Sequence, residues 1–303
     1  MTWLYFNLLV FALLGLDLFV LNRRDHVIGV REALGWSAFW IGVSLTFNFF
    51  IYVWRGETAA VEFLTAYLLE KSLSVDNLFV FILLFNYFRV PPQYQHKVLF
   101  WGIIGALILR ATFILVGVAL IQKFAWTTYI LGGFLVYTGF QLFRAGGEPE
   151  INPDGNLLVR WVSRHLPVTR EFEGGKFFVY KEKLRFATPL FIVLLMVETT
   201  DVVFAADSIP AVLAVSSDPF IVYSSNVFAL MGLRALYFAL AGVIHLFHYL
   251  HYGLALILVF IGSKMIAAYW ELHLDDVTSL LVVGGVLLVS MVVSLLFPKA
   301  GAA

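Results

Sequence analysis

The chain of 303 residues is 61% hydrophobic and only 13% charged, with a formal net charge of zero and a mean hydropathy of +0.89. A soluble core of this size cannot bury so much apolar sequence, which excludes a soluble globular protein and predicts a polytopic membrane protein. The chain contains no cysteine, which excludes disulfides, zinc–thiolate sites, iron–sulfur clusters and thiol catalysis. A metal ion in this protein would have to be bound by oxygen or by histidine.

Nine hydrophobic segments, each long enough to cross a bilayer, follow one another along the chain. They cover residues 4–21, 34–54, 60–88, 98–120, 126–145, 187–215, 222–245, 252–269 and 277–297. The third and sixth are longer than a straight crossing requires, as expected of tilted or broken helices. No basic run precedes the first segment and no small-residue cleavage site follows it, so we expect a retained span and not a signal peptide. The pattern predicts an all-α membrane protein with nine transmembrane helices.

Lysine and arginine are distributed unevenly between the connections, and this predicts the orientation. Only Arg55 and Lys123 lie in the connections after the even-numbered segments, whereas fourteen basic residues follow the odd-numbered ones. These are Arg23, Arg24, Arg31, Arg89, Lys97, Arg144, Arg160, Arg164, Arg170, Lys176, Lys181, Lys183, Arg185 and Lys299. Because basic connections stay in the cytoplasm, we expect the amino terminus outside and the carboxyl terminus in the cytoplasm.

Acidic residues interrupt the third and sixth segments in a matching pattern. Each segment carries two carboxylates six residues apart, and a small polar residue follows the second carboxylate. The residues are Glu70, Asp76 and Asn77 in one segment, and Asp201, Asp207 and Ser208, preceded by Glu198, in the other. Carboxylates at membrane depth are costly and indicate an ion or proton pathway. Bringing them together on one ion requires a distorted helix, and Pro210 predicts a break in the second segment.

Two further blocks match in the same order and with similar gaps. The stretch 109–113 resembles 233–237, including an arginine at the second position, and 129–139 resembles 252–262. Each copy holds three segments, an odd number, so the second copy starts from the opposite face of the membrane. This predicts a 3+3 inverted-topology repeat, with segments three to five against six to eight and a substrate site near the midplane.

The repeat divides the chain into five regions. Residues 1–57 hold the accessory segments one and two, and residues 58–145 the first copy. A cytoplasmic linker loop, 146–186, leads to the second copy at 187–270, and its stretch 175–184 is expected either to form a short hairpin or to pack on the membrane face. Residues 271–303 hold the accessory ninth segment and a short tail.

The charged residues inside the segments do not balance. Away from the segment ends, six acids lie there against four bases, namely Lys71, Arg110, Arg234 and Lys264. The acids could simply pair with these bases, but complete pairing still leaves negative charge that requires protons or a cation. We expect Arg110 and Arg234 to hold carboxylates in place rather than to contact substrate, and Lys71 to be a counter-ion to an unidentified acid. Asp17, in the first segment, is a further candidate for the site.

The two acidic stretches resemble the hallmark segments of the TerC family. The residues concerned are Ser74–Leu78 and Val197–Asp201, continuing through Phe204–Ala211. The nine-segment layout, with Gly15-Leu16-Asp17 and the loop stretch Gly174–Val179, is similar to that of the Alx-type bacterial members, and the resemblance covers about residues 10–297. It implies an inner-membrane transporter of the wider lysine-exporter superfamily, associated with manganese efflux and with responses to alkaline pH.

The expected ligands are oxygen atoms. Carboxylate, amide and hydroxyl oxygens without thiolate suit Mn²⁺, Ca²⁺ or Mg²⁺ better than copper or zinc, and the choice of manganese comes from the resemblance. The candidate metal ligands are Glu70, Asp76, Asn77, Glu198, Asp201 and Asp207, with Asp17, Lys71, Ser208, Arg110 and Arg234 as further polar residues. No nucleotide-binding motif is present, so uphill export would use an ion gradient, with protons as the exchanged ion.

Two other classes of protein remain open from the sequence. A transporter of small organic solutes such as amino acids would use the same repeat but should have more aromatic or cationic site residues. An intramembrane aspartyl protease also requires two membrane aspartates, but its Gly-x-Gly-Asp context is absent. We therefore expect a transporter and not an enzyme, with a metal ion, protons and the lipid bilayer as partners, and without an organic cofactor or nucleic acid.

Overall fold

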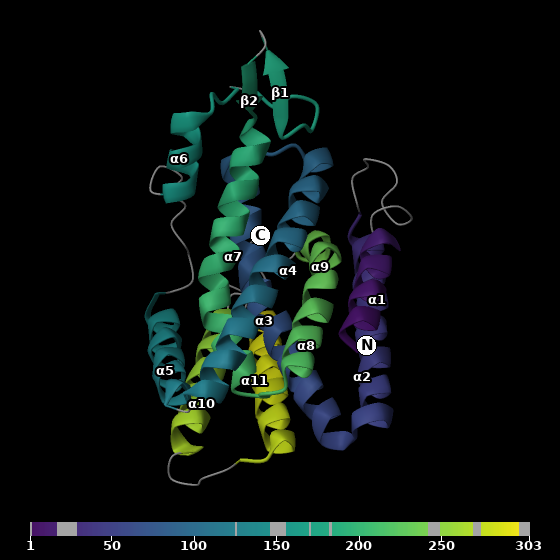
Figure 1. The fold of residues 1–303 in the computed structure, drawn as a ribbon, viewed down its shortest axis with the longest axis vertical. Helices are drawn as coiled ribbons and strands as arrows, with labels where there is room; N and C mark the ends of the chain where they lie inside the picture. The colour runs from purple at the N-terminus through teal and green to yellow at the C-terminus, as the bar shows by residue number, and fades with distance from the viewer. Residues whose placement is uncertain are drawn as a thin grey trace.

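The computed structural model describes residues 2–16, 29–124, 126–145, 156–169, 171–181, 184–241, 249–268 and 274–296. Over these residues the protein is a helical bundle with one small two-stranded sheet (Figure 1). The helices are α1 (Thr2–Leu16), α2 (Val30–Arg55), α3 (Glu57–Tyr87), α4 (Pro92–Lys123), α5 (Thr127–Ala145), α6 (Leu157–His165), α7 (Pro189–Leu213), α8 (Pro219–Met231), α9 (Leu233–Leu240), α10 (Leu250–Ala267) and α11 (Asp276–Leu296). The strands are β1 (Phe178–Lys181) and β2 (Leu184–Ala187).

Over the described residues, each hydrophobic segment of the sequence overlaps a helix, the seventh segment being shared by α8 and α9. By length and hydropathy, five helices in the described ranges could cross a membrane: α2, α4, α7, α10 and α11. The pair α8–α9, bent by 41°, would be a sixth span, and α1 is apolar but shorter than a full crossing. The all-α membrane class is thus confirmed, while nine crossings stay a prediction.

The helix break that the sequence predicted in the second acidic segment is absent from α7. The helix α7 continues through Pro210 and ends only at Leu213, so the break expected beside Asp207 is wrong. Pro210 stands close to the end of the helix, where only one further turn depends on it. The bend lies instead in the following segment, at Gly232, which separates α8 from α9.

The helices of the two predicted copies pack in exchanged pairs. Helix α3 packs against α8 and α4 against α7, while α5 packs against α10. In the α5–α10 contact, a Cβ atom built on Gly132 would lie 2.9 Å from the carbonyl oxygen of Gly262, and one on Gly139 would lie 2.8 Å from that of Ala255. When the stretch 129–139 is aligned with its repeat 252–262, Gly132 aligns with Ala255 and Gly139 with Gly262. Exchanging the two copies therefore converts one of these contacts into the other. A twofold relation would produce such pairs; the inverted repeat and the five regions stay predictions.

The linker loop carries a hairpin at one end of the bundle (Figure 1). The sequence left two possibilities open for the stretch 175–184, a short hairpin or packing on the membrane face. Strands β1 and β2 pair antiparallel, with Phe178 opposite Ala187, so the hairpin is confirmed. A Cβ atom on Gly175, whose φ is +70°, would lie 2.9 Å from the side chain of Tyr94. The hairpin base therefore packs against the start of α4.

The opposite end of the bundle is held by polar contacts between other connections. Arg55, at the end of α2, forms an ion pair with Asp218. The Asp218 carboxylate also accepts a hydrogen bond from the backbone N–H of Phe220 at 2.8 Å and caps α8. Glu62 accepts a hydrogen bond from the Ser216 hydroxyl at 2.5 Å. The connections after α2 and α7 thus lie at the same end, as alternate crossing requires.

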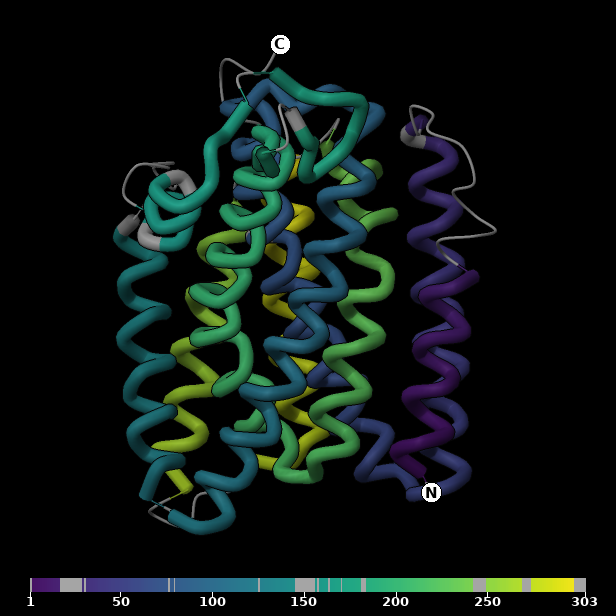
Figure 2. Tube along the Cα trace, turned by 45° about the horizontal axis from the view of Figure 1, so that its top comes forward, coloured from purple at the N-terminus to yellow at the C-terminus, as the bar shows by residue number. Residues whose placement is uncertain are grey.

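The accessory helices α1 and α2 lie side by side at one edge of the bundle (Figure 2). Aromatic side chains join them to α8, with ring centroids 5.3 Å apart between Phe6 and Phe220 and 4.6 Å apart between Phe47 and Phe228. Asp17, the acid predicted in the first segment, lies outside the described residues.

The orientation can be tested by labelling, because the chain has no native cysteine. His165 on α6 and Gln122 at the end of α4 are both exposed and belong to opposite ends of the bundle. In intact cells, an impermeant maleimide should label Gln122→Cys but should label His165→Cys only after permeabilisation, because the basic linker is expected in the cytoplasm. Labelling of His165→Cys from outside would overturn the predicted orientation.

Candidate functional site

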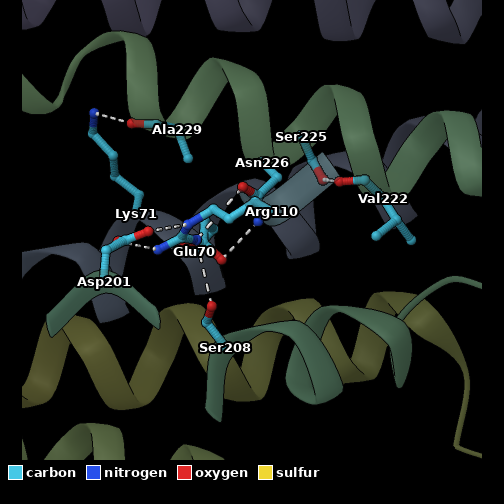
Figure 3. Close-up of polar contacts among 9 residues, drawn as sticks. All are labelled: Glu70, Lys71, Arg110, Asp201, Ser208, Val222, Ser225, Asn226 and Ala229. Carbon is cyan, nitrogen blue, oxygen red and sulfur yellow. Dashed lines mark hydrogen bonds and ion pairs between the residues drawn. The ribbon is translucent and has the colours of Figure 1, made fainter. Parts of the chain in front are cut away.

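A buried arginine lies at the centre of the bundle. Arg110, in the middle of α4, is 1% exposed. Its guanidinium forms ion pairs with Glu70 of α3 and with Asp201 of α7 (Figure 3). Nη2 donates to Oδ1 of Asp201 at 3.1 Å and Nε donates to Oδ2 at 3.4 Å, the two-point geometry that suits a planar guanidinium. Both carboxylates are also buried, so one cation joins two acids from different helices.

Two neutral polar side chains complete this cluster. Nη1 of Arg110 donates to the Ser208 hydroxyl at 3.4 Å and to Oδ1 of Asn226 at 3.5 Å. Asn226, in α8, donates from Nδ2 to Oε2 of Glu70 at 3.0 Å. The cluster of Glu70, Arg110, Asp201, Ser208 and Asn226, called the Arg110 cluster below, therefore joins α3, α4, α7 and α8. Ser208 was singled out from the sequence.

Asn226 was not singled out from the sequence, although a signal for it existed. It ends a run of three polar residues, Ser224-Ser225-Asn226, inside an otherwise apolar segment. All three are buried, and the two serine hydroxyls donate to backbone carbonyls of the preceding turn, Ser225 to Val222 (Figure 3). The asparagine side chain reaches across to α3 and α4, whereas both serines bond within their own helix.

The two acids bound by Arg110 hold corresponding positions in the two acidic stretches. Glu70 precedes Asp76 by six residues, and Asp201 precedes Asp207 by the same number. The ion pairs agree with the expectation that Arg110 holds carboxylates in place. Counted as ionised groups, one arginine and two carboxylates leave one negative charge in a buried site. Such an excess is costly unless a proton or a cation compensates it.

Glu198 approaches the cluster from the preceding turn of α7. Its carboxylate lies directly against α4, where a Cβ atom built on Gly105 would overlap Oε1 of Glu198. Glycine is therefore the residue that leaves room for this carboxylate between the two helices. Glu198 is partly exposed, unlike Asp201 three residues later.

The remaining predicted ligands lie on the same two helices. Asn77 on α3 is buried, and Asp207 on α7 is partly exposed. Asp76 belongs to α3, but its side chain lies outside the described part of the structure. Among the described side chains, no group of three or more histidine or acidic residues is placed to hold a metal ion. The structure therefore brings Glu70 and Asp201 together through Arg110, and does not bring all six predicted ligands onto one point.

Lys71 contacts a backbone carbonyl at the break in the seventh segment. Its Nζ donates to the carbonyl oxygen of Ala229 at 3.1 Å (Figure 3). Ala229 lies four residues before Leu233, where α9 begins, so this carbonyl belongs to the turn that the break interrupts. A Cβ atom on Gly232 would lie 2.6 Å from Nζ, so the glycine leaves room for the ammonium group. The sequence predicted an acid as partner; the described contact is to the main chain.

Arg234, the predicted counterpart of Arg110, is buried at the start of α9. The neighbouring residues Glu70 and Lys71 of α3 contact two successive turns of α8. Glu70 is bonded to Asn226, and Lys71 is bonded to the carbonyl of Ala229. The site and the bent segment are therefore mechanically connected.

Comparisons with known proteins give one consistent answer. Residues 55–302 match the family model described as the integral membrane protein TerC family. The chain is 47% identical to an uncharacterized membrane protein of Myxococcus xanthus over 294 residues, or 97% of this chain and 92% of that protein. It is 46% identical over 301 residues to proteins of Salmonella typhi and Escherichia coli (strain K12) named provisionally as membrane-bound redox modulator Alx, covering 96% of this chain and 93% of each relative. No solved structure gives a significant match.

Proposed function

Because this chain belongs to the TerC family of integral membrane proteins, we propose that it exports a divalent metal ion, Mn²⁺, across the bacterial inner membrane in exchange for protons. The observation that carries the proposal is the Arg110 cluster. Two buried carboxylates from helices α3 and α7 face one buried guanidinium, so this cluster holds one more acid than base inside an apolar bundle. Ionisable groups at such a depth are characteristic of ion pathways.

The donor chemistry favours a hard cation. In this proposal the ligands are drawn from Glu70, Asp76, Asn77, Glu198, Asp201 and Asp207, all of which offer oxygen atoms. Oxygen donors alone suit Mn²⁺, Mg²⁺ and Ca²⁺. Manganese among these is the substrate implied by the sequence resemblance to Alx-type proteins, and Ca²⁺ and amino acids are the alternatives to be tested beside it.

In this proposal the exchanged protons are carried by the candidate acids outside the Arg110 cluster. Carboxylates that are desolvated and close together hold protons more firmly than they do in water. A metal ion binds only deprotonated ligands, so binding would release protons. The chain has no nucleotide-binding motif to supply energy in another way.

The redox function in the names of the relatives has no thiol basis in this chain. It contains no cysteine, so its own residues cannot carry out thiol–disulfide exchange. In this proposal an effect on cellular redox state acts through the transported ion, and manganese, which has several oxidation states, fits that role.

The test is transport by purified protein in proteoliposomes. With an acidic lumen and Mn²⁺ outside, an enclosed metal-sensitive dye should report Mn²⁺ entry, and a pH dye should report proton loss from the lumen at the same time. Protein-free liposomes are the control, and Ca²⁺ and lysine are offered in parallel. Movement of lysine without movement of any metal would replace the proposal by organic-solute transport.

A further inference from the structure

The Arg110 guanidinium occupies the place between two acids that the repeat makes equivalent. All four of their carboxylate oxygens are engaged. Oε1 of Glu70 pairs with Arg110, and Oε2 accepts from Asn226. Oδ1 and Oδ2 of Asp201 both accept from Arg110. In this arrangement each of the four oxygens already contacts Arg110 or Asn226.

A metal ion and Arg110 are therefore competitors for the same oxygens. The guanidinium is charged at any physiological pH, so it cannot leave by losing its proton. It can leave only by moving, and two alternative acceptors are already within reach, the Ser208 hydroxyl at 3.4 Å and Oδ1 of Asn226 at 3.5 Å. Neither of these carries a formal charge, so the guanidinium could keep hydrogen bonds there after giving up the carboxylates.

We propose that Arg110 is a resident counter-cation, which the transported divalent ion displaces from Glu70 and Asp201 and which returns when the ion leaves. This inference rests on the proposed function. Between transport events the returning guanidinium spares the bundle two unpaired buried carboxylates, which would be strongly destabilising. It also weakens metal binding, because the apparent affinity is reduced by the fraction of protein in which the acids are available. Arg110 would thus favour release and allow turnover.

This role differs measurably from a purely structural one. If Arg110 only held α3, α4 and α7 together, its removal would disorder the ligands and weaken metal binding. If it competes with the metal, its removal should tighten binding and slow transport, because a metal ion would then be the sole partner of the two acids. The two roles predict opposite changes in the dissociation constant.

The experiment compares Mn²⁺ binding by calorimetry and Mn²⁺ flux in proteoliposomes for the parent, Arg110→Gln and Arg110→Lys. We expect the apparent Kd of Arg110→Gln to fall at least about threefold while the maximal flux falls. Arg110→Lys keeps a positive charge but cannot bind both acids in the same two-point manner, so its Kd and its flux should lie between those of the other two.

Lys71→Met is the matched control, because it removes another intramembrane cation that contacts a carbonyl and not the two acids. Its Kd should change less than that of Arg110→Gln. Equal tightening in both variants would mean that any loss of positive charge suffices, and would overturn the competition. Unchanged or weaker Mn²⁺ binding by Arg110→Gln would also overturn the competition. If the glutamine variant does not fold, the same outcome for Arg110→Lys would overturn it. A parent that neither binds nor moves metal would instead refute the proposed function.

Discussion

Replacing the Glu70 carboxylate by an amide should reduce Mn²⁺ export at least about tenfold, since even groups that only support metal ligands contribute about 10–100-fold to metal affinity. Glu70→Gln preserves the size of the side chain and its hydrogen bond with Asn226, so the bundle should still assemble. What it removes is a formal charge from a site that selects its ion by charge and hardness. The readouts are protection of a manganese-sensitive strain and flux in proteoliposomes, both at matched protein levels.

The same outcome is expected for Asp201→Asn, and for Asp76→Asn and Asp207→Asn, the second acids of the two stretches. The matched control is Glu62→Gln on the same helix α3. Glu62 is a partly exposed acid at the end of the bundle, bonded to Ser216. Eight residues separate it from Glu70, about 12 Å along a helix. The Glu62→Gln variant should therefore leave Mn²⁺ export intact. Full export by the Glu70, Asp201, Asp76 and Asp207 variants would place the site elsewhere.

A larger side chain at Gly132, which should force α5 away from α10, is expected to cause a large loss of stability of the folded protein. In Gly132→Val, the new Cβ atom would lie 2.9 Å from the carbonyl oxygen of Gly262 and 3.0 Å from Cβ of Met265. These are backbone and near-backbone atoms that cannot rotate away, so the two helices must move apart. Overpacking of this kind typically costs about 1–3 kcal/mol, and occasionally more. The midpoint of heat-induced loss of the monodisperse peak, measured by size-exclusion chromatography in detergent, should fall clearly.

Its control is the neighbouring residue. Gly133→Val introduces the same side chain on the same helix with the same intrinsic helix propensity, but a Cβ atom there meets nothing within 4 Å. Gly133→Val should therefore stay close to the parent. Equal loss in the two variants would mean that valine destabilises α5 itself, and that the α5–α10 contact contributes little.

Much of the architecture follows from the sequence because it depends on local composition. Long apolar runs must form helices in a bilayer, where every backbone group needs an internal partner. Their spacing therefore predicted the positions of the helices, and a short hairpin, which β1 and β2 form, was one of two possibilities for the linker stretch 175–184. The paired acids identified α3 and α7 as the helices of the candidate site, since a carboxylate in an apolar segment stands out whatever its neighbours are.

The partners of the charged residues were decided only by the tertiary structure. The sequence required a counter-ion for Glu70 and for Asp201, but it could not show that a single arginine serves both, nor that Asn226 joins them. Lys71 has a carbonyl as its described partner, and the bend lies at Gly232 and not at Pro210. The physical reason is the same in each case. Burial creates the need for a partner, which composition reveals, but the partner is whichever group the packing of α3, α4, α7 and α8 brings within about 3 Å, the reach of a hydrogen bond.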